Sequence, residues 1–189
     1  GLEYKKERKD DLNKINKYFE VKLATVVRDK DENFIPKKST INRKNSNLFG
    51  SISSDISNYL NINYNFAIDN NYKNFEYNNL NATLSIDNFV TKIKFIEENG
   101  EMGDSNVLEN EIGYKFDDQN YLSFNTRRNR KLNLTEYYNL VYEYQNDCLT
   151  AGIKYKKSYY EDRDLKPTEN LLFTITLFPL TTYEHDGRD

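Results

Sequence analysis

The chain has 189 residues and is nearly neutral, with 27 Lys and Arg against 30 Asp and Glu, a net charge of −3. This balance argues against a nucleic-acid-binding protein, which needs clustered positive charge. The mean hydropathy is −0.90, and no run approaches the roughly 20 apolar residues of a membrane-spanning helix, so that class of protein is excluded as well.

Apolar residues recur at every second position, most clearly over residues 59–68. In this segment Leu60, Ile62, Tyr64, Phe66 and Ile68 alternate with Asn61, Asn63 and Asn65. Successive side chains of a strand point to opposite faces, so the segment is predicted to be a β-strand with one apolar and one polar face.

The same alternation, taken along the chain, predicts about ten or eleven strands, most of them long enough to cross a bilayer at a tilt. They are expected at 2–9 (a truncated strand), 17–27, 48–56, 59–68, 80–86, 89–95, 108–116, 121–127, 138–144, 149–155 and 171–177.

The links between these strands alternate in length. Short links are expected at 57–58, 87–88, 117–120 and 146–148, and longer ones at 28–46, 69–74, 97–106, 128–134 and 161–169. Bacterial membrane barrels have short periplasmic turns and longer outer loops. Counting back from a last strand that ends inside, every short link falls on the periplasmic side.

The predicted fold class is therefore all-β, an antiparallel transmembrane β-barrel. Residues 1–180 are assigned to the C-terminal part of a larger barrel and residues 181–189 to a polar C-terminal tail. The chain opens Gly1-Leu2-Glu3, with no initiator Met and no signal peptide, which favours a fragment of a longer protein.

Charged residues of both signs occupy the polar faces of neighbouring strands. We expect them to face a watery lumen and to pair across adjacent strands, although the solvated face of any antiparallel sheet is the alternative. The candidates are Lys92, Lys94, Glu109, Glu111, Lys115 and Arg127.

Residues for covalent or metal chemistry are scarce. The one histidine, His185, lies in the polar tail and supports no catalytic triad, and one cysteine cannot form a Cys-rich zinc site. We therefore expect no enzyme, metal or cofactor. Cys148 falls at a predicted periplasmic turn, where it is either disulfide-bonded to a partner elsewhere or an unpaired thiol.

The C-terminal part resembles a known family. Thr126-Arg127-Arg128-Asn129, the stretch 136–149 (EYYNLVYEYQNDCL), Gly152-Ile153-Lys154-Tyr155, Asp162-Arg163-Asp164, Pro167 and 172–177 (LFTITL) resemble the end of LptD, the lipopolysaccharide-assembly protein of the outer membrane. The segment 100–105 (GEMGDS) fits a loop of the same family. The resemblance covers about residues 97–180.

This resemblance implies an integral protein of the cell outer membrane, a barrel of about two dozen strands, which lies within the range of bacterial barrels. It implies a function in inserting lipopolysaccharide into the outer leaflet. Its implied partners are an LptE-like plug lipoprotein and, through an N-terminal domain, a periplasmic LptA-like bridge.

The resemblance also implies roles for individual residues. Leu171, Phe173, Ile175, Leu177 and Pro179 would form one lip of a lateral gate, and Cys148 would bond to the periplasmic domain. Family members can carry adjacent cysteines where this chain has Asp147-Cys148. Two other functions remain open from the sequence: a generic porin or outer-membrane channel, and a soluble β-rich surface-binding module.

Overall fold

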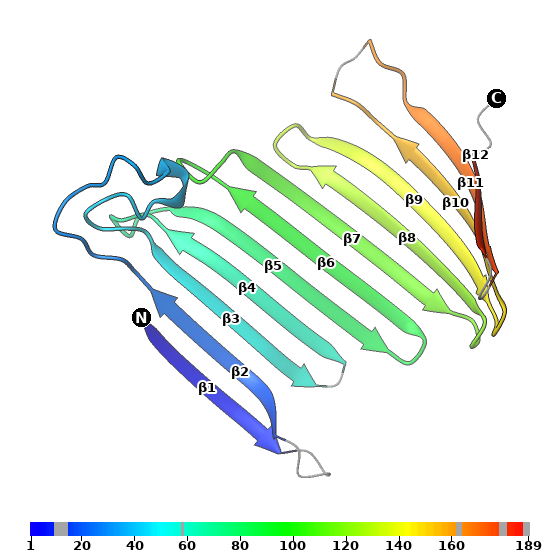
Figure 1. Cartoon of the computed structure of the whole chain (residues 1–189), viewed down its shortest axis with the longest axis horizontal. Helices are drawn as coiled ribbons and strands as arrows, with labels where there is room; N and C mark the ends of the chain where they lie inside the picture. Colours follow the sequence, from blue (N-terminus) through cyan, green and yellow to red (C-terminus); the bar gives the residue numbers. More distant parts are fainter. Residues whose placement is uncertain (10–14, 58, 162–163, 178–180, 187–189) are drawn as a thin grey trace. The chain divides into compact units, whose positions relative to one another are not determined.

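The computed structural model describes residues 1–9, 15–57, 59–161, 164–177 and 181–186, with only the backbone described at 15–18 and 181–186. Within these residues, 12 β-strands follow one another in the sheet in chain order (Figure 1). The chain divides into two compact units, one of Gly1–Leu84 and Ile93–Val107, the other of Ser85–Lys92 and Leu108–Asp189. The predicted all-β antiparallel fold is confirmed.

The first unit is built from antiparallel strands joined by tight turns and longer loops. Its strands are β1 (Leu2–Lys9), β2 (Ile15–Ala24), β3 (Leu48–Ser57), β4 (Leu60–Ile68) and most of β5 (Phe75–Ile86), together with parts of β6 (Phe89–Glu98) and β7 (Ser105–Lys115). The pairing register aligns Val21 with Ile52, Ile52 with Tyr64, and Tyr64 with Leu80. These residues therefore form one row across four strands.

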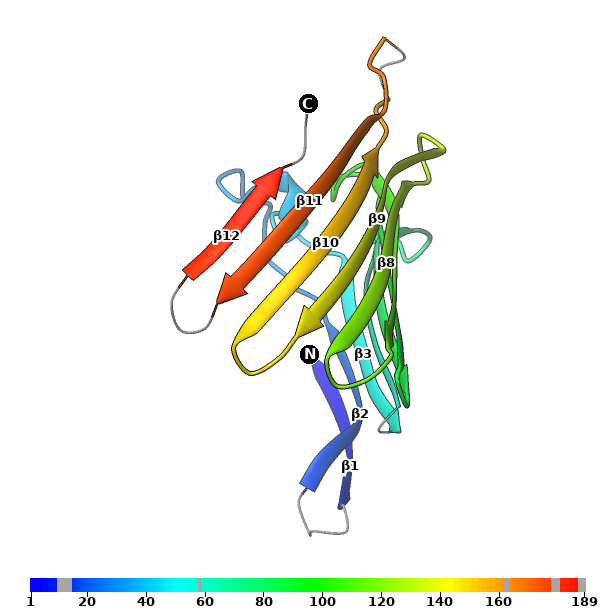
Figure 2. The ribbon, with the colours of Figure 1, turned by 90° about the vertical axis from the view of Figure 1, so that its right-hand side faces the viewer.

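The second unit continues the same construction. Its remaining strands are β8 (Asn120–Asn129), β9 (Leu134–Gln145), β10 (Leu149–Ser158), β11 (Thr168–Leu177) and β12 (Thr181–Asp186), which lie side by side in Figure 2. Ile153 is aligned with Tyr142 on one side and with Phe173 on the other. Leu122 is aligned with Tyr142, so this unit also has an apolar row across four strands.

Every predicted strand is present, and the segment assigned to a polar tail contains one further strand. Residues 181–186 form β12, which pairs with β11 from Leu172↔Asp186 to Leu177↔Thr181. The sequence there lacks clear apolar alternation, but a strand at the edge of a sheet needs only backbone hydrogen bonds to one neighbour.

The alternation of loop lengths is present in part. In the first unit the links 25–47, 69–74 and 99–104 are long. In the second, the turns 87–88 and 146–148 are shorter than the link 159–167, but 116–119 and 130–133 are equal in length, so the predicted difference is absent at that pair. Because β12 follows β11, the strand at 171–177 is not the last one, so the inside–outside assignment now depends on loop length alone.

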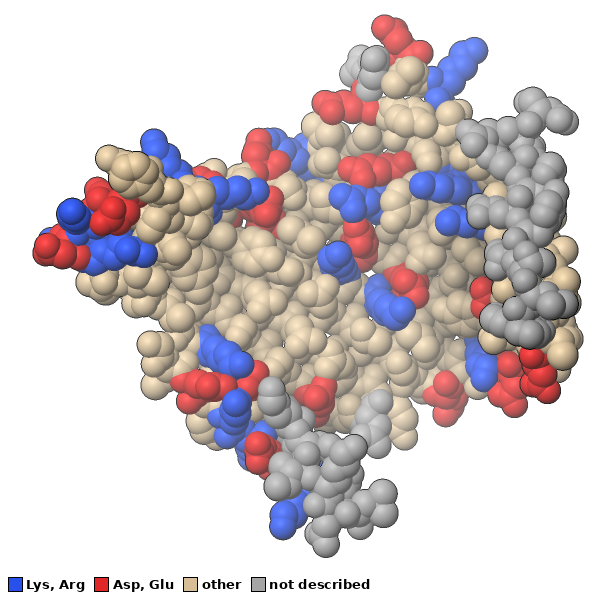
Figure 3. Space-filling model, in the orientation of Figure 1, with Lys and Arg blue, Asp and Glu red and all other residues tan. Residues whose placement is uncertain are grey.

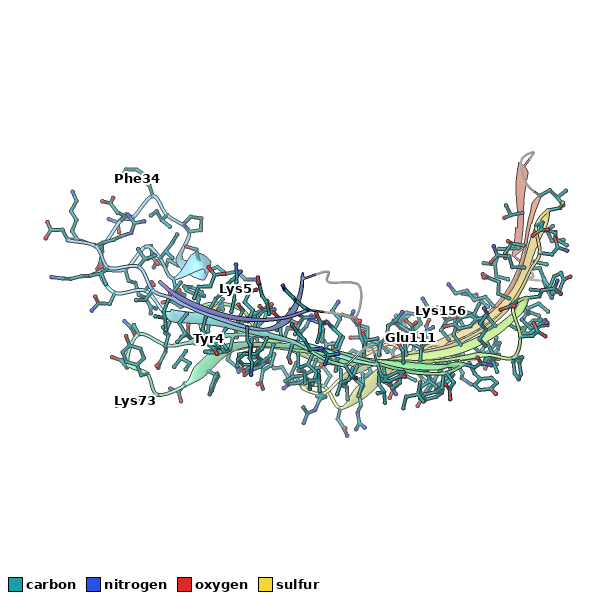
Figure 4. All side chains as sticks on the ribbon, turned by 90° about the horizontal axis from the view of Figure 1, so that it is seen from below. Tyr4, Lys5, Phe34, Lys73, Glu111 and Lys156 are labelled. Atoms are coloured by element: carbon teal, nitrogen blue, oxygen red, sulfur yellow. The ribbon has the colours of Figure 1, made fainter. Side chains whose placement is uncertain are left out.

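Each unit is a single layer of strands with two different faces. Figure 4 shows Tyr4 and Lys5 on opposite sides of β1, as strand alternation requires. Among the described residues, the buried hydrophobic side chains are Ala67 and Val107. No helix within the described residues is long and apolar enough to span a membrane, and the helical element found there is the short η1 (Lys37–Ser39).

The apolar face of the second unit is uncovered. Ile153 is 43% exposed and Phe173 is 40% exposed, although both lie in the middle of their strands. Large apolar side chains at the centre of a sheet are normally covered by a second layer. Within the described residues of this unit, no second layer covers them.

Candidate functional site

The polar face of the second unit carries a three-residue ion-pair group centred on Arg127. The guanidinium on β8 contacts the carboxylates of Glu109 on β7 and Glu136 on β9, with 2.6 Å between Nε and Glu136 Oε2. A bulge in β8–β9 pairing between Arg127 and Arg128 lies beside this group. Its side chains are 27% to 38% exposed, so solvent still reaches the charges.

A second ion pair joins β6 and β7 on the same unit. Lys92 Nζ lies 2.8 Å from Glu111 Oε1, and the two side chains are 52% and 36% exposed. Exposed pairs of this kind contribute about 0 to 1 kcal/mol to stability. The arrangement of charge on this face therefore contributes little to the stability of the strand pairing. Its main effect is on the solutes that approach this face. Figure 4 shows Glu111 and Lys156 on the same side of the sheet.

The predicted cross-strand pairing of charges is confirmed for Lys92, Glu111, Glu109 and Arg127. Lys115 instead pairs with Asp118 in the adjoining turn, at 2.9 Å. Lys94 lies two residues from Lys92 on β6, but in the first unit. Sequence reasoning did not include Glu136, because the bulge that brings it to Arg127 leaves no periodic signal.

The polar face of the first unit carries amides in place of charges along β4 and β5. Asn63 donates to Asn61 at 2.7 Å, Asn81 donates to Asn79 at 2.9 Å, and Asn79 donates to the Tyr77 hydroxyl at 3.0 Å. Figure 3 shows the middle of β3 and β4 free of the colours that mark Lys, Arg, Asp and Glu. This amide ladder was present in the sequence only as Asn at alternate positions.

The first two strands of the first unit carry charged residues on this face. Lys22 Nζ lies 3.2 Å from Glu20 Oε2 and 3.5 Å from Glu3 Oε1, while Lys5 Nζ lies 2.8 Å from Glu3 Oε1. These residues belong to β1 and β2, where the register pairs Lys5 with Glu20 and Glu3 with Lys22. Positive and negative charges thus neutralise one another across the strand pair.

The long link 25–47 of the first unit is a folded segment. Its two arms hydrogen-bond, from Arg28 N to Lys44 O at 2.8 Å and from Ser46 N to Val26 O at 2.9 Å. Asn47, which ends the link, is fully buried and donates to Glu76 at 2.5 Å. These contacts hold the base of the link against the strands of the same unit.

Carboxylates organise the turns outside the strands. Asp117 accepts hydrogen bonds from the Asn120 side chain and from the backbone N–H groups of Gln119 and Asn120, each at 2.8 Å. These bonds favour the ionised form and lower the pKa of Asp117. In the link 69–74, the backbone N–H of Lys73 lowers the pKa of Asp69 in the same way.

The residues assigned to a lateral gate lie on the apolar face of β11. Leu171, Phe173, Ile175 and Leu177 are all exposed, and Pro179 lies outside the described residues. β11 pairs with β10 on one side and β12 on the other, so it is not an edge strand in this structure. Its role in a gate stays a prediction.

Cys148 lies in the turn between β9 and β10. Its side chain is exposed and unbonded, and its backbone N–H donates to Asn146 Oδ1 at 3.0 Å. The inter-domain disulfide implied by the LptD resemblance likewise stays a prediction.

No protein-family model and no curated protein sequence matches the chain. Among solved structures, a triple mutant of the Rhodopseudomonas blastica porin matches with a TM-score of 0.54 and 12% identity, over 93% of this chain and 73% of the porin. Another mutant of the same porin matches with a TM-score of 0.52 and 11% identity, over the same shares. These matches concern porins, so the finer resemblance to LptD is not supported by them. At this level of identity the likeness concerns the fold, and the chain has the antiparallel β-fold of bacterial outer-membrane porins.

Proposed function

We propose that this chain forms part of the wall of a water-filled channel in the cell outer membrane. The apolar face of the sheet would contact lipid and the polar face would line the lumen. The observation that carries this proposal is the uncovered apolar face of a single-layer sheet, opposite a face of ion pairs and amides. A membrane barrel needs both faces in this arrangement.

The height of the apolar band agrees with a bilayer. On β10 it runs from Leu149 to Lys157, where the Lys157–Glu169 ion pair ends it at 2.7 Å. Eight residue steps of about 3.4 Å span about 27 Å along the strand, or about 20 Å along the membrane normal at a tilt near 40°. This is close to the roughly 25 Å of a typical outer-membrane band.

Aromatic rings lie where the band ends. The rings of Tyr138 and Tyr159 meet edge to face at 5.9 Å, and the Lys157 ammonium lies 5.8 Å from the Tyr159 ring centre. Tyrosine and lysine are typical of the membrane–water interface, where an apolar body and a polar tip are both solvated well. This group therefore supports the upper boundary of the band.

A soluble surface-binding module is the weaker alternative. It would expose the row of Leu122, Tyr142, Ile153 and Phe173 to water, together with the rows on either side. Soluble monomers rarely expose contiguous apolar patches of this extent. A soluble module should remain monodisperse in plain buffer, whereas a membrane wall should require detergent.

Alternate-residue labelling tests the proposal directly. In a Cys148→Ser background, Ile153→Cys and Lys154→Cys place a thiol on opposite faces of one strand. In vesicles, a membrane-impermeant maleimide should label Lys154→Cys and leave Ile153→Cys unlabelled, while the unsubstituted protein should conduct ions in planar bilayers. Equal labelling of the two thiols, or absence of conductance, would contradict the channel wall.

Lipopolysaccharide insertion is a finer version of this proposal. It is supported by the sequence resemblance to LptD and by the exposed thiol of Cys148, which is accessible to a bonding partner. If it is correct, the protein isolated without reductant should carry Cys148 in a disulfide, and lipopolysaccharide and an LptE-like lipoprotein should copurify with it. A free Cys148 thiol in the membrane-inserted protein would argue for the plain channel.

A further inference from the structure

A pocket of about 350 Å³ opens on the polar face of the first unit, across β2 to β5. Its lining includes Ala24, Phe49, Tyr77 and Met102 on the apolar side, and Lys22, Ser51 and Asn65 on the polar side. The volume is at the lower end of the range typical of small-molecule sites. It lies on the face that we assign to the lumen, so what it binds depends on that proposed function.

The strand register brings the two aromatic residues of the pocket close together. Phe49 is aligned with Ala67, and Ala67 with Tyr77, so the two aromatic residues flank a small one across three strands. Ala67 is completely buried and does not itself line the pocket. Met102, from the link 99–104, adds a thioether to the same wall. The result is an apolar cleft on an otherwise polar surface.

The neighbouring row of residues, two positions farther along β3, supplies hydrogen-bonding groups. Lys22 is aligned with Ser51, Ser51 with Asn65, and Asn65 with Asn79. Two residues along a strand cover about 7 Å, so the aromatic row and the polar row lie about one sugar ring apart. The Tyr77 hydroxyl accepts from Asn79 and keeps its own proton for another acceptor.

The charge of the pocket favours a neutral ligand. No carboxylate lines it in the part of the chain described. Its ammonium group, Lys22 Nζ, already lies within 3.2 Å of Glu20 and 3.5 Å of Glu3. An anionic ligand would have to compete with these two carboxylates, whereas a neutral one would not.

We infer that this pocket binds a neutral hexopyranose unit. The apolar face of the ring would pack against Phe49 and Tyr77, and its hydroxyl groups would bond Ser51, Asn65 and the Tyr77 hydroxyl. Aromatic rings beside uncharged amides and hydroxyls suit such a ring, which is apolar on its faces and polar at its edge. The channel wall would then hold a sugar subsite on its way through the lumen.

The absence of tryptophan from the chain provides a specific reporter. In Phe49→Trp, the single Trp lies in the pocket, and in Phe124→Trp it lies on the apolar face of the second unit as the matched control. Methyl α-D-glucopyranoside should change the emission of the first variant saturably, in the millimolar range, and leave the second unchanged. Adding Tyr77→Ala should weaken binding by roughly tenfold, and Asn65→Ala by severalfold.

The glucuronide, which has the same ring with a carboxylate, distinguishes a neutral site from an anion site. It should bind more weakly than the glucoside; equal or tighter binding would overturn the inference. Titration calorimetry of the unsubstituted protein in detergent measures sugar binding without any substitution. The absence of a heat of binding up to about 100 mM glucoside would also overturn the inference. Neither the fluorescence titration nor the calorimetry depends on ion conductance. Loss of conductance with sugar binding retained would contradict the channel alone, and conductance without sugar binding would contradict the pocket alone.

Discussion

A charge on the apolar face of β11 should be far more costly than the same charge one residue away. Phe173 leaves about 40% of its surface uncovered by protein. For a side chain of about 200 Å² this is about 80 Å², worth about 2 kcal/mol in hydrocarbon at 25 cal/mol per Å². Arginine at the middle of the band adds about 2 to 4 kcal/mol. Phe173→Arg should therefore destabilise the inserted protein by about 4 to 6 kcal/mol.

Thr174→Arg is the matched control, because its side chain belongs to the polar face and the new charge would stay in water. Its effect should be within about 0.5 kcal/mol, and Leu177→Arg, near the end of the band, should be intermediate. The folded fraction can be followed across a urea series in vesicles by the gel mobility of unheated samples. Equal destabilisation by Phe173→Arg and Thr174→Arg would refute the assignment of the two faces.

Three further predictions concern charge, packing and pH. Arg127→Gln leaves two carboxylates without their cation on the polar face, so the reversal potential in a KCl gradient should shift toward cation selectivity. The stability cost should be about 1 kcal/mol, because the group is partly exposed. An unchanged reversal potential would contradict the placement of this group in the lumen. Gly50→Ala would place a Cβ against the Phe66 ring, so it should cost about 1 to 3 kcal/mol in urea titrations, and Phe66→Ala should largely relieve the cost. Additive effects of the two changes would contradict the contact. Because the folded-state pKa of Asp117 is lowered, its stabilising effect is present above the unfolded pKa of about 3.9 and is lost as the pH falls through the folded value. NMR titration should find the pKa of this carboxyl below its usual range. Asp117→Asn should abolish that part of the acid sensitivity of the 116–119 turn.

The alternation of apolar and polar residues along the chain was sufficient to predict the strands, because the residues of each strand alternate between its apolar and its polar face. In the segment Leu60–Ile68, apolar residues alternate with asparagine, and this pattern is present in the sequence whichever strands lie beside it. The structure forms β4 there. The alternation of loop lengths could be predicted in part for the same reason, since each link is bounded by two local patterns. The segment 181–186 could not be predicted, because the backbone pairing that makes it a strand depends on β11 rather than on its own apolar residues.

The amino-acid order thus sets the period of each strand, and with it the division of the chain into a lipid-compatible and a water-compatible face. Contacts between strands are a different matter, because they depend on register and on bulges that join residues distant in the chain. Glu109 and Glu136 are 27 positions apart, and it is β8 between them that lets Arg127 reach both. In the same way, Phe49 and Tyr77, which are 28 positions apart, line one pocket because strand pairing sets them on either side of Ala67.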